Sequence, residues 1–155
     1  MHRSFVNVAK TLIVAGLLSA CGAAYCQGEE PASVGLGASR TPLGEGSYQV
    51  YSTFEDARCA SGTGHLATLA SEEWKVVPLK SGTRQYILAV MHDTRGGTAS
   101  RTCRNLISFV PPPYYEYSLR QDPTDAQSCV IEIYDLDRGT PPPDLIVEDP
   151  QACPQ

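Results

Sequence analysis

The chain has 155 residues, of which 42% are apolar and 19% charged, and its formal net charge is −5. This length suits one domain of about 100–200 residues, and the 12 prolines and 13 glycines exclude a long helical bundle or a coiled coil. The negative net charge also argues against nucleic acid as a partner, because phosphate recognition requires basic surfaces.

Residues 1–20 have the pattern of a secretory signal peptide. Arg3 and Lys10 make the first ten residues positive, and residues 11–20 form an apolar run without a charge. A positive segment followed by about 7–15 apolar residues directs export. The run is also shorter than the roughly 20 residues that a membrane-spanning helix needs. We therefore predict an exported protein without a transmembrane span.

The apolar run ends in Leu18-Ser19-Ala20-Cys21, which resembles the lipobox of bacterial prolipoproteins. The resemblance implies cleavage before Cys21, diacylation of its thiol and acylation of its new amine by a fatty acid such as palmitate. Several acyl chains anchor a protein stably, since each buried CH₂ contributes about 0.8 kcal/mol. Gly22 stands where the family's inner-membrane retention signal has Asp, which implies lipid anchoring in the outer membrane, facing the periplasm or the cell surface.

A second cleavage site, Ala24-Tyr25-Cys26, leaves open a soluble periplasmic or secreted protein. Cleavage before Gln27 leaves four cysteines, an even number, whereas lipidation of Cys21 leaves Cys26 without a partner. The lipobox match favours the anchored form and the cysteine parity favours the soluble form.

Residues 21–46 are expected to be a flexible, lipid-anchored linker. Six glycines lie in residues 22–46, and we find no regular apolar period there. Such a linker would hold a folded domain clear of the lipid headgroups.

Residues 47–139 are expected to form a single small antiparallel β-sandwich with an immunoglobulin-like architecture. Short segments of alternating apolar and polar residues, separated by glycine- or proline-rich turns, are typical of this fold. Residues 85–91 are apolar on both faces, which predicts a central strand. Residues 66–73 could hold one turn of helix. The expected strands are 48–54, 74–77, 85–91, 103–110, 115–120 and 129–134. Residues 140–155 are expected to be a proline-rich tail, with an edge strand at 145–147.

The cysteines of the domain and tail predict two disulfides. Strand alternation places Cys103 and Cys129 on core-facing positions at the same end of the domain, so we expect them to pair. Cys59 and Cys153 would then tie the tail to the early part of the domain.

No metal or other cofactor is expected. None of these four cysteines has the C-x₂₋₄-C spacing of a zinc site. The segment Asp135–Gly139 resembles the start of a calcium loop, but Ile146 occupies the position where such a loop needs a bidentate Glu. We therefore expect a turn there.

The region 101–135 is also similar to small uncharacterised proteobacterial lipoproteins. The shared order is Cys103, Phe109-Val110-Pro111, Tyr115-x-Tyr117 and Cys129. The resemblance implies no activity.

Two histidines, His65 and His92, are the candidates for catalysis. His92 precedes Asp93, but successive residues of a strand point to opposite faces, and the chain has no G-x-S-x-G nucleophile motif. We therefore predict no catalytic residue.

Tyr114 is the candidate for surface binding. Three tyrosines cluster at 114, 115 and 117, and alternation assigns Tyr115 and Tyr117 to the core. Exposed tyrosines contribute to ligand and protein interfaces.

Together these features predict an exported, lipid-anchored β-sandwich that acts as a non-enzymatic accessory or binding module. The alternatives are a soluble, disulfide-stapled secreted protein of inhibitor or adhesion type, and a small His-dependent hydrolase.

Overall fold

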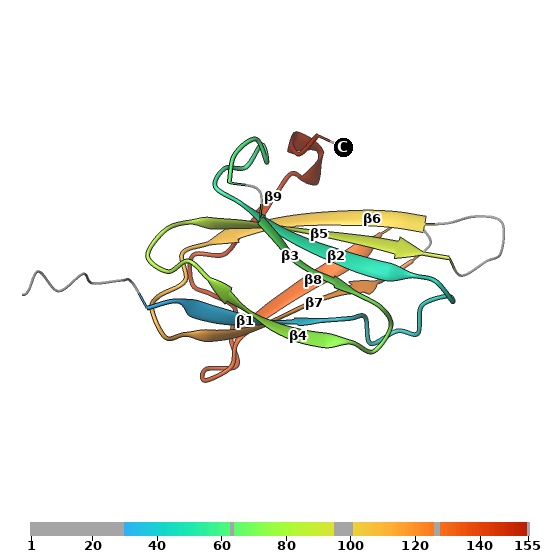
Figure 1. Ribbon diagram of the computed structural model, residues 1–155, viewed down its shortest axis with the longest axis horizontal. Coiled ribbons are helices and arrows are strands. Elements are labelled where there is room, and N and C mark those ends of the chain that lie inside the picture. The colour runs from blue at the N-terminus through green and yellow to red at the C-terminus, as the bar shows by residue number, and fades with distance from the viewer. Residues whose placement is uncertain (1–29, 63, 95–100, 126–127, 155) are drawn as a thin grey trace, which may run out of the picture.

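The computed structural model describes residues 30–62, 64–94, 101–125 and 128–154. They form two β-sheets packed against each other (Figure 1). Among these residues no α-helix occurs, and the only helical element is the short 3₁₀ helix η1, Pro150–Ala152. The predicted all-β sandwich is confirmed.

The chain passes repeatedly between a four-stranded and a five-stranded sheet. The four-stranded sheet has the order β4-β1-β7-β8, with β1 Ala32–Gly37, β4 Trp74–Leu79, β7 Glu116–Pro123 and β8 Cys129–Asp135. The five-stranded sheet has the order β3-β2-β5-β6-β9, with β2 Tyr48–Phe54, β3 Gly64–Leu69, β5 Gln85–Asp93, β6 Arg101–Phe109 and β9 Ile146–Glu148. Every strand pair is antiparallel except β1 with β7, which is parallel.

The core lies between the two sheets and is built from the inward-pointing residues of each strand. Ile87 of β5, Ile107 of β6 and Leu119 of β7 are fully buried there. Each such side chain stabilises the fold by about 1.5–3 kcal/mol relative to its exposed state. The segment expected to be a central strand is β5, which lies between β2 and β6.

The expected linker over residues 21–46 is wrong from residue 32 onward. β1 lies between β4 and β7 and pairs with both, and its Val34 and Leu36 are fully buried. Glycine at 35 and 37 hides the alternation, because the outward positions carry no polar side chain that would mark them. The folded domain therefore begins at residue 32 and not at 47, while residues 21–29 lie outside the described part of the chain.

The helical turn expected within residues 66–73 is also wrong. Residues 64–69 form β3, which pairs with β2 across a register shift at Tyr51 and Ser52. Ala67 and Leu69 point into the core. The shift interrupts the regular period that identifies the other strands.

The C-terminal residues belong to the domain. The predicted edge strand exists as β9, in which Val147 pairs with Ile107 of β6. The Asp149 side chain then caps η1 by accepting a hydrogen bond from the Gln151 amide. The expected boundary at 139 is therefore too early, because β9 and the residues up to Cys153 pack against the five-stranded sheet.

Both predicted disulfides are present. Cys103 of β6 is bonded to Cys129 of β8 with a Cα–Cα distance of 6.0 Å, which joins the two sheets. Cys59, in the loop after β2, is bonded to Cys153 after η1 with a Cα–Cα distance of 5.0 Å. Two disulfides indicate an oxidising, extracytoplasmic environment.

The link between the sheets should be a major source of stability. Replacing Cys103 and Cys129 by Ala should lower the free energy of unfolding by about 2–5 kcal/mol, because the bond restricts the unfolded chain. The Cys59→Ala/Cys153→Ala variant keeps the Cys103–Cys129 bond and lacks the other disulfide. Its free energy of unfolding, measured by chemical denaturation with and without reductant, therefore reports the contribution of the Cys103–Cys129 bond. No loss of stability on reduction of that variant would contradict the expectation.

β1 should be indispensable to the fold. Leu36→Ala should cost about 2–5 kcal/mol, as expected for a fully buried leucine, whereas Ser33→Ala on the outward face of the same strand should be almost neutral. Chains beginning at residue 30 should give a β-type circular dichroism spectrum, and chains beginning at residue 47 should not fold. Equal stabilities of the two point variants would show that β1 is dispensable.

Candidate functional site

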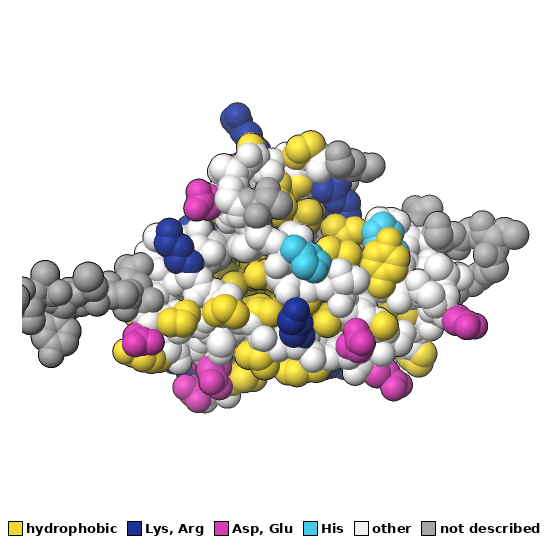
Figure 2. All heavy atoms as spheres, viewed as in Figure 1, with side chains coloured by type: hydrophobic (Ala, Val, Ile, Leu, Met, Phe, Trp, Pro, Cys, Tyr) yellow, Lys and Arg dark blue, Asp and Glu magenta, His cyan; other side chains and the backbone are white. Residues whose placement is uncertain are grey.

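The outer face of the five-stranded sheet carries a hollow of about 430 Å³. We call it the β5–β6 groove. It is lined by Leu88, Val90 and His92 of β5, Thr102 and Arg104 of β6, and Pro154. The three β5 residues share the outward face because alternate residues of a strand point the same way. Figure 2 shows both histidine side chains at the surface, with hydrophobic side chains gathered near one of them.

A small apolar cluster supports the groove. Phe54, Leu88, Leu106 and Cys153 are buried on this outer face. Cys59 packs against this cluster through its disulfide to Cys153, and the next residue, Pro154, lines the groove. The sequence predicted this disulfide but not its place beside a hollow.

The loop that presents Cys59 is held by the Asp56 carboxylate. Asp56 accepts hydrogen bonds from the Ser61 hydroxyl at 2.5 Å, the Ser61 amide at 3.0 Å and the Arg58 amide at 2.8 Å. The bond from the Ser61 hydroxyl is the main reason why the pKa of Asp56 is lowered. Since the pKa of Asp56 is lowered in the folded state, its ionised carboxylate stabilises the fold. This stabilisation is complete above the ordinary carboxyl pKa and is lost as the pH falls through the lowered pKa.

Polar groups line the rim of the groove. The His92 ring packs on Tyr48 with a centroid separation of 4.6 Å, and its Nδ1 lies 3.1 Å from the Thr102 hydroxyl. Arg104 donates a hydrogen bond of 3.0 Å to the Cys153 carbonyl. An apolar floor with a few placed polar groups is typical of ligand sites.

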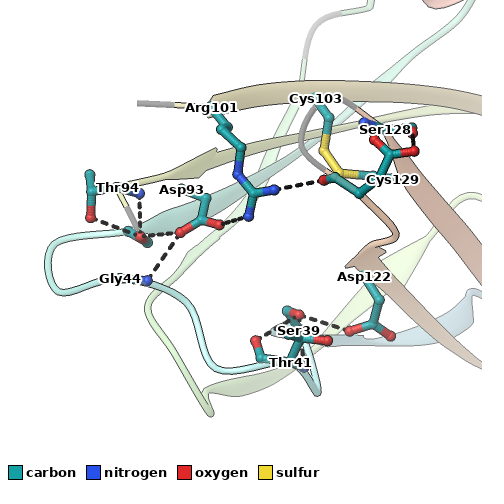
Figure 3. A network of polar contacts seen from close by, with 12 residues as sticks. Ser39, Thr41, Gly44, Asp93, Thr94, Arg101, Cys103, Asp122, Ser128 and Cys129 are labelled. Atoms are coloured by element: carbon teal, nitrogen blue, oxygen red, sulfur yellow. Dashed lines mark hydrogen bonds and ion pairs between the residues drawn. A yellow bond between two sulfur atoms is a disulfide. The ribbon is translucent and has the colours of Figure 1, made fainter. Parts of the chain in front are cut away.

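Among the described residues, the side-chain hydrogen bonds of His92 and His65 are to threonine hydroxyls and not to carboxylates. His92 and Asp93 point to opposite faces, as expected: Asp93 is fully buried, paired with Arg101, and accepts a hydrogen bond of 3.1 Å from the Gly44 amide (Figure 3). His65 lies exposed on β3, 3.5 Å from the Thr68 hydroxyl. No carboxylate is among the residues that line the β5–β6 groove.

A second hollow of about 420 Å³ lies near the other end of β5. It has Glu55, Lys80 and Arg84 in its wall, but neither His65 nor His92 lines it. Neither hollow therefore has the base and orienting acid that a His-dependent hydrolase requires.

Tyr114 is exposed, as expected, with three quarters of its surface accessible. It follows the three prolines after β6 and adopts φ +65°. Tyr117 packs in the core, where burial raises the pKa of its hydroxyl to about 12. Tyr115 is only partly buried against the core, and its hydroxyl accepts a hydrogen bond of 2.6 Å from Arg138. Tyr114 lines neither hollow, so its role in binding stays a prediction.

The segment Asp135–Gly139 forms the expected turn. The Asp135 carboxylate accepts hydrogen bonds from the amides of Asp137 at 2.9 Å and Arg138 at 3.1 Å. Gly139 completes the turn with φ +65°. Across the described residues, no three His, Cys, Asp or Glu side chains gather into a metal site.

No protein-family model matches this chain, and no curated protein sequence matches it. No helix among the described residues is long and apolar enough to cross a membrane. The predicted signal peptide, Cys21 and Cys26 lie outside the described residues.

Proposed function

We propose that the protein is an exported, lipid-anchored binding module of the cell envelope, with the β5–β6 groove as its binding site. The observation that carries this proposal is the groove itself, a mainly apolar hollow on a sheet face, beside the Cys59–Cys153 disulfide. The positive and apolar leader and the lipobox support export and anchoring, and the two disulfides fit an oxidising compartment.

The contacts that His92 and Arg104 make at the rim of the groove favour binding over catalysis. His92 contacts Tyr48 and Thr102, and Arg104 is held by a backbone carbonyl. These contacts fix the side chains in place without supplying a nucleophile or an acid–base pair. A site that is rigid before binding loses little conformational entropy when a ligand enters.

The groove fits a compact apolar group with a hydrogen-bond acceptor or a negative charge. Its volume of about 430 Å³ is within the range of small-molecule sites. Leu88 and Val90 would contact the apolar part, while Arg104 and His92 would face the acceptor. A free ligand and a side chain of an envelope partner can both present such a group, and the chemistry recognised is the same.

The lipid anchor depends on Cys21. Cys21→Ser should block acylation and leave the protein unprocessed or soluble, because the thiol is the acyl acceptor in the lipobox reading. Intact mass of the mature protein and its partition between detergent and water measure this. A wild-type chain that starts at Gln27 and stays in the aqueous phase would instead support the soluble, secreted form.

The groove should bind a small apolar anion. Anilinonaphthalene sulfonate is a suitable probe, since its fluorescence rises in apolar surroundings. Val90→Glu should weaken its binding at least about tenfold, because a tenfold change needs only about 1.4 kcal/mol and burying a charge costs more. Val76→Glu, an exposed position on the opposite sheet, is the matched control. Equal effects of the two variants would mean that the dye does not bind in the groove.

A further inference from the structure

The outer face of the four-stranded sheet carries a second set of exposed apolar side chains. Trp74 is 47% exposed and Val76 61% exposed on β4, and Tyr134 is exposed on β8. Val130 and Leu136 are exposed near the two ends of β8. This face is separate from the β5–β6 groove, because it belongs to the other sheet.

The Trp74 ring lies flat on the backbone of β1. An ideal Cβ built on Gly35 would lie 1.9 Å from Trp74 Cζ2, and one built on Gly37 would lie 2.9 Å from Trp74 Cε3. Both glycines are thus needed for the ring to approach the strand this closely. Since one ring face rests on β1 while about half of the side chain is accessible, the other face is open to solvent.

The side chain of Arg120 lies beside this ring. Arg120 of β7 pairs in register with Gly37, and its Nε lies 3.0 Å from the Cβ position built there. Arg120 Nε is buried and makes no hydrogen bond. The nearest acid in the same cross-strand row, Glu132, instead contacts Arg40 at 3.3 Å.

We propose that this face, the Trp74 platform, binds a β-1,4-linked chain of pyranose sugars. A pyranose presents an apolar C–H face, which would stack on the open face of Trp74, and carries its oxygens around the ring edge. Arg120 lies beside the ring, where the terminal nitrogens of its guanidinium would donate hydrogen bonds to those oxygens. A β-1,4 linkage keeps successive sugars extended, so that neighbouring sugars could lie along the sheet beside Trp74.

The combination of groups favours a sugar over a protein partner. The aromatic surface is a single ring laid parallel to the sheet, whereas protein interfaces centre on side chains that enter a pocket of the partner. The Ser118 side chain shares this outward face, in the row between Gly35 and Tyr134. Hydroxyl and guanidinium donors around one open aromatic face match the mixed apolar and polar surface of a pyranose.

Trp74 is the only tryptophan of the chain, so tryptophan fluorescence, excited selectively over that of the tyrosines, reports on this platform alone. Chitohexaose, a neutral β-1,4-linked oligomer, and hexamannuronate, an acidic one, are the probes, titrated into the full mature protein. Binding should shift the emission to shorter wavelength and protect the ring from iodide quenching, with saturation at millimolar sugar or below. If neither oligomer changes the emission or the quenching, the proposal is overturned.

Calorimetric titration of variants assigns the contacts. Trp74→Ala and Arg120→Gln should each weaken binding at least about tenfold, a change of roughly 1.4 kcal/mol. Tyr48→Ala, which removes an exposed aromatic side chain from the opposite sheet, is the matched control and should leave the affinity unchanged. Binding of hexamannuronate alone, lost in Arg120→Gln, would assign Arg120 to a carboxylate, whereas binding that survives Trp74→Ala would overturn the proposal.

Gly35→Ala provides a second variant that keeps the ring. The added methyl group must displace Trp74 from β1, so the variant should bind sugar more weakly while the anilinonaphthalene sulfonate signal of the groove is unchanged. If Trp74→Ala does not fold, iodide protection in the wild type and in Gly35→Ala decides the matter. Failure of sugar binding leaves the dye result at the β5–β6 groove intact, so the two proposals are tested independently.

Discussion

The burial of one face of β1 is the constraint on which the rest of the domain depends. Val34 and Leu36 fill the core, while the strand bridges β4 and β7 by pairing with both. Without it β4 would lose its partner in the four-stranded sheet and β7 and β8 would remain as a two-stranded ribbon, which is marginally stable in water when isolated. The Trp74 ring packs on the other face of the same strand. One six-residue segment therefore sets both the packing of the core and the shape of an outer surface.

A layer of polar groups inside the sandwich fixes how the sheets meet near the Cys103–Cys129 bond. Gln49 donates a hydrogen bond of 2.8 Å to the Gln121 carbonyl across the sheets, and Gln121 lies 3.2 Å from the Cys103 sulfur. The Tyr51 hydroxyl donates to the Gly37 carbonyl at 2.9 Å, and burial of this side chain raises its pKa well above the ordinary value. Buried polar groups are costly unless they are paired, so these bonds favour one alignment of the two sheets over others.

The parts that sequence reasoning found are those in which local pattern and tertiary structure agree. β2 and the strands from β6 to β8 alternate visibly, whereas β5 is recognisable as a run that is apolar on both faces. The alternation also predicts that Cys103 and Cys129 point toward each other. β1 was missed because Gly35 and Gly37 replace polar residues on its outward face, so that composition suggested a linker. Yet glycine at every second position beside valine and leucine is itself a signal of close approach by another group, here the Trp74 ring.

The β5–β6 groove lay beyond prediction for a different reason. Pro154, which lines the groove, is far in the sequence from the β5 and β6 residues beside it, and the neighbouring Cys153 is held there by its disulfide to Cys59. Alternation assigns Leu88 and Val90 to a face but does not say what covers that face. The periodicity of apolar residues predicts strands. It does not predict hollows, which form where segments from distant parts of the chain pack on those strands.

Two aspartates, Asp122 and Asp93, hold the connection between β1 and β2 in place. Asp122 accepts hydrogen bonds from the Ser39 hydroxyl at 2.8 Å and the Arg40 amide at 2.6 Å, just after β1. Asp93 accepts from the Gly44 amide and the Ser47 hydroxyl, just before β2 (Figure 3). The two carboxylates therefore hold both ends of the connection that carries the chain from one sheet to the other. A buried ion pair such as Asp93–Arg101 adds little net stability, but removing one partner is costly, so its role is to fix this crossover and with it the position of β1. These acids are thus committed to the fold, while the outer faces of the sheets present aromatic, apolar and cationic groups, a division suited to recognition.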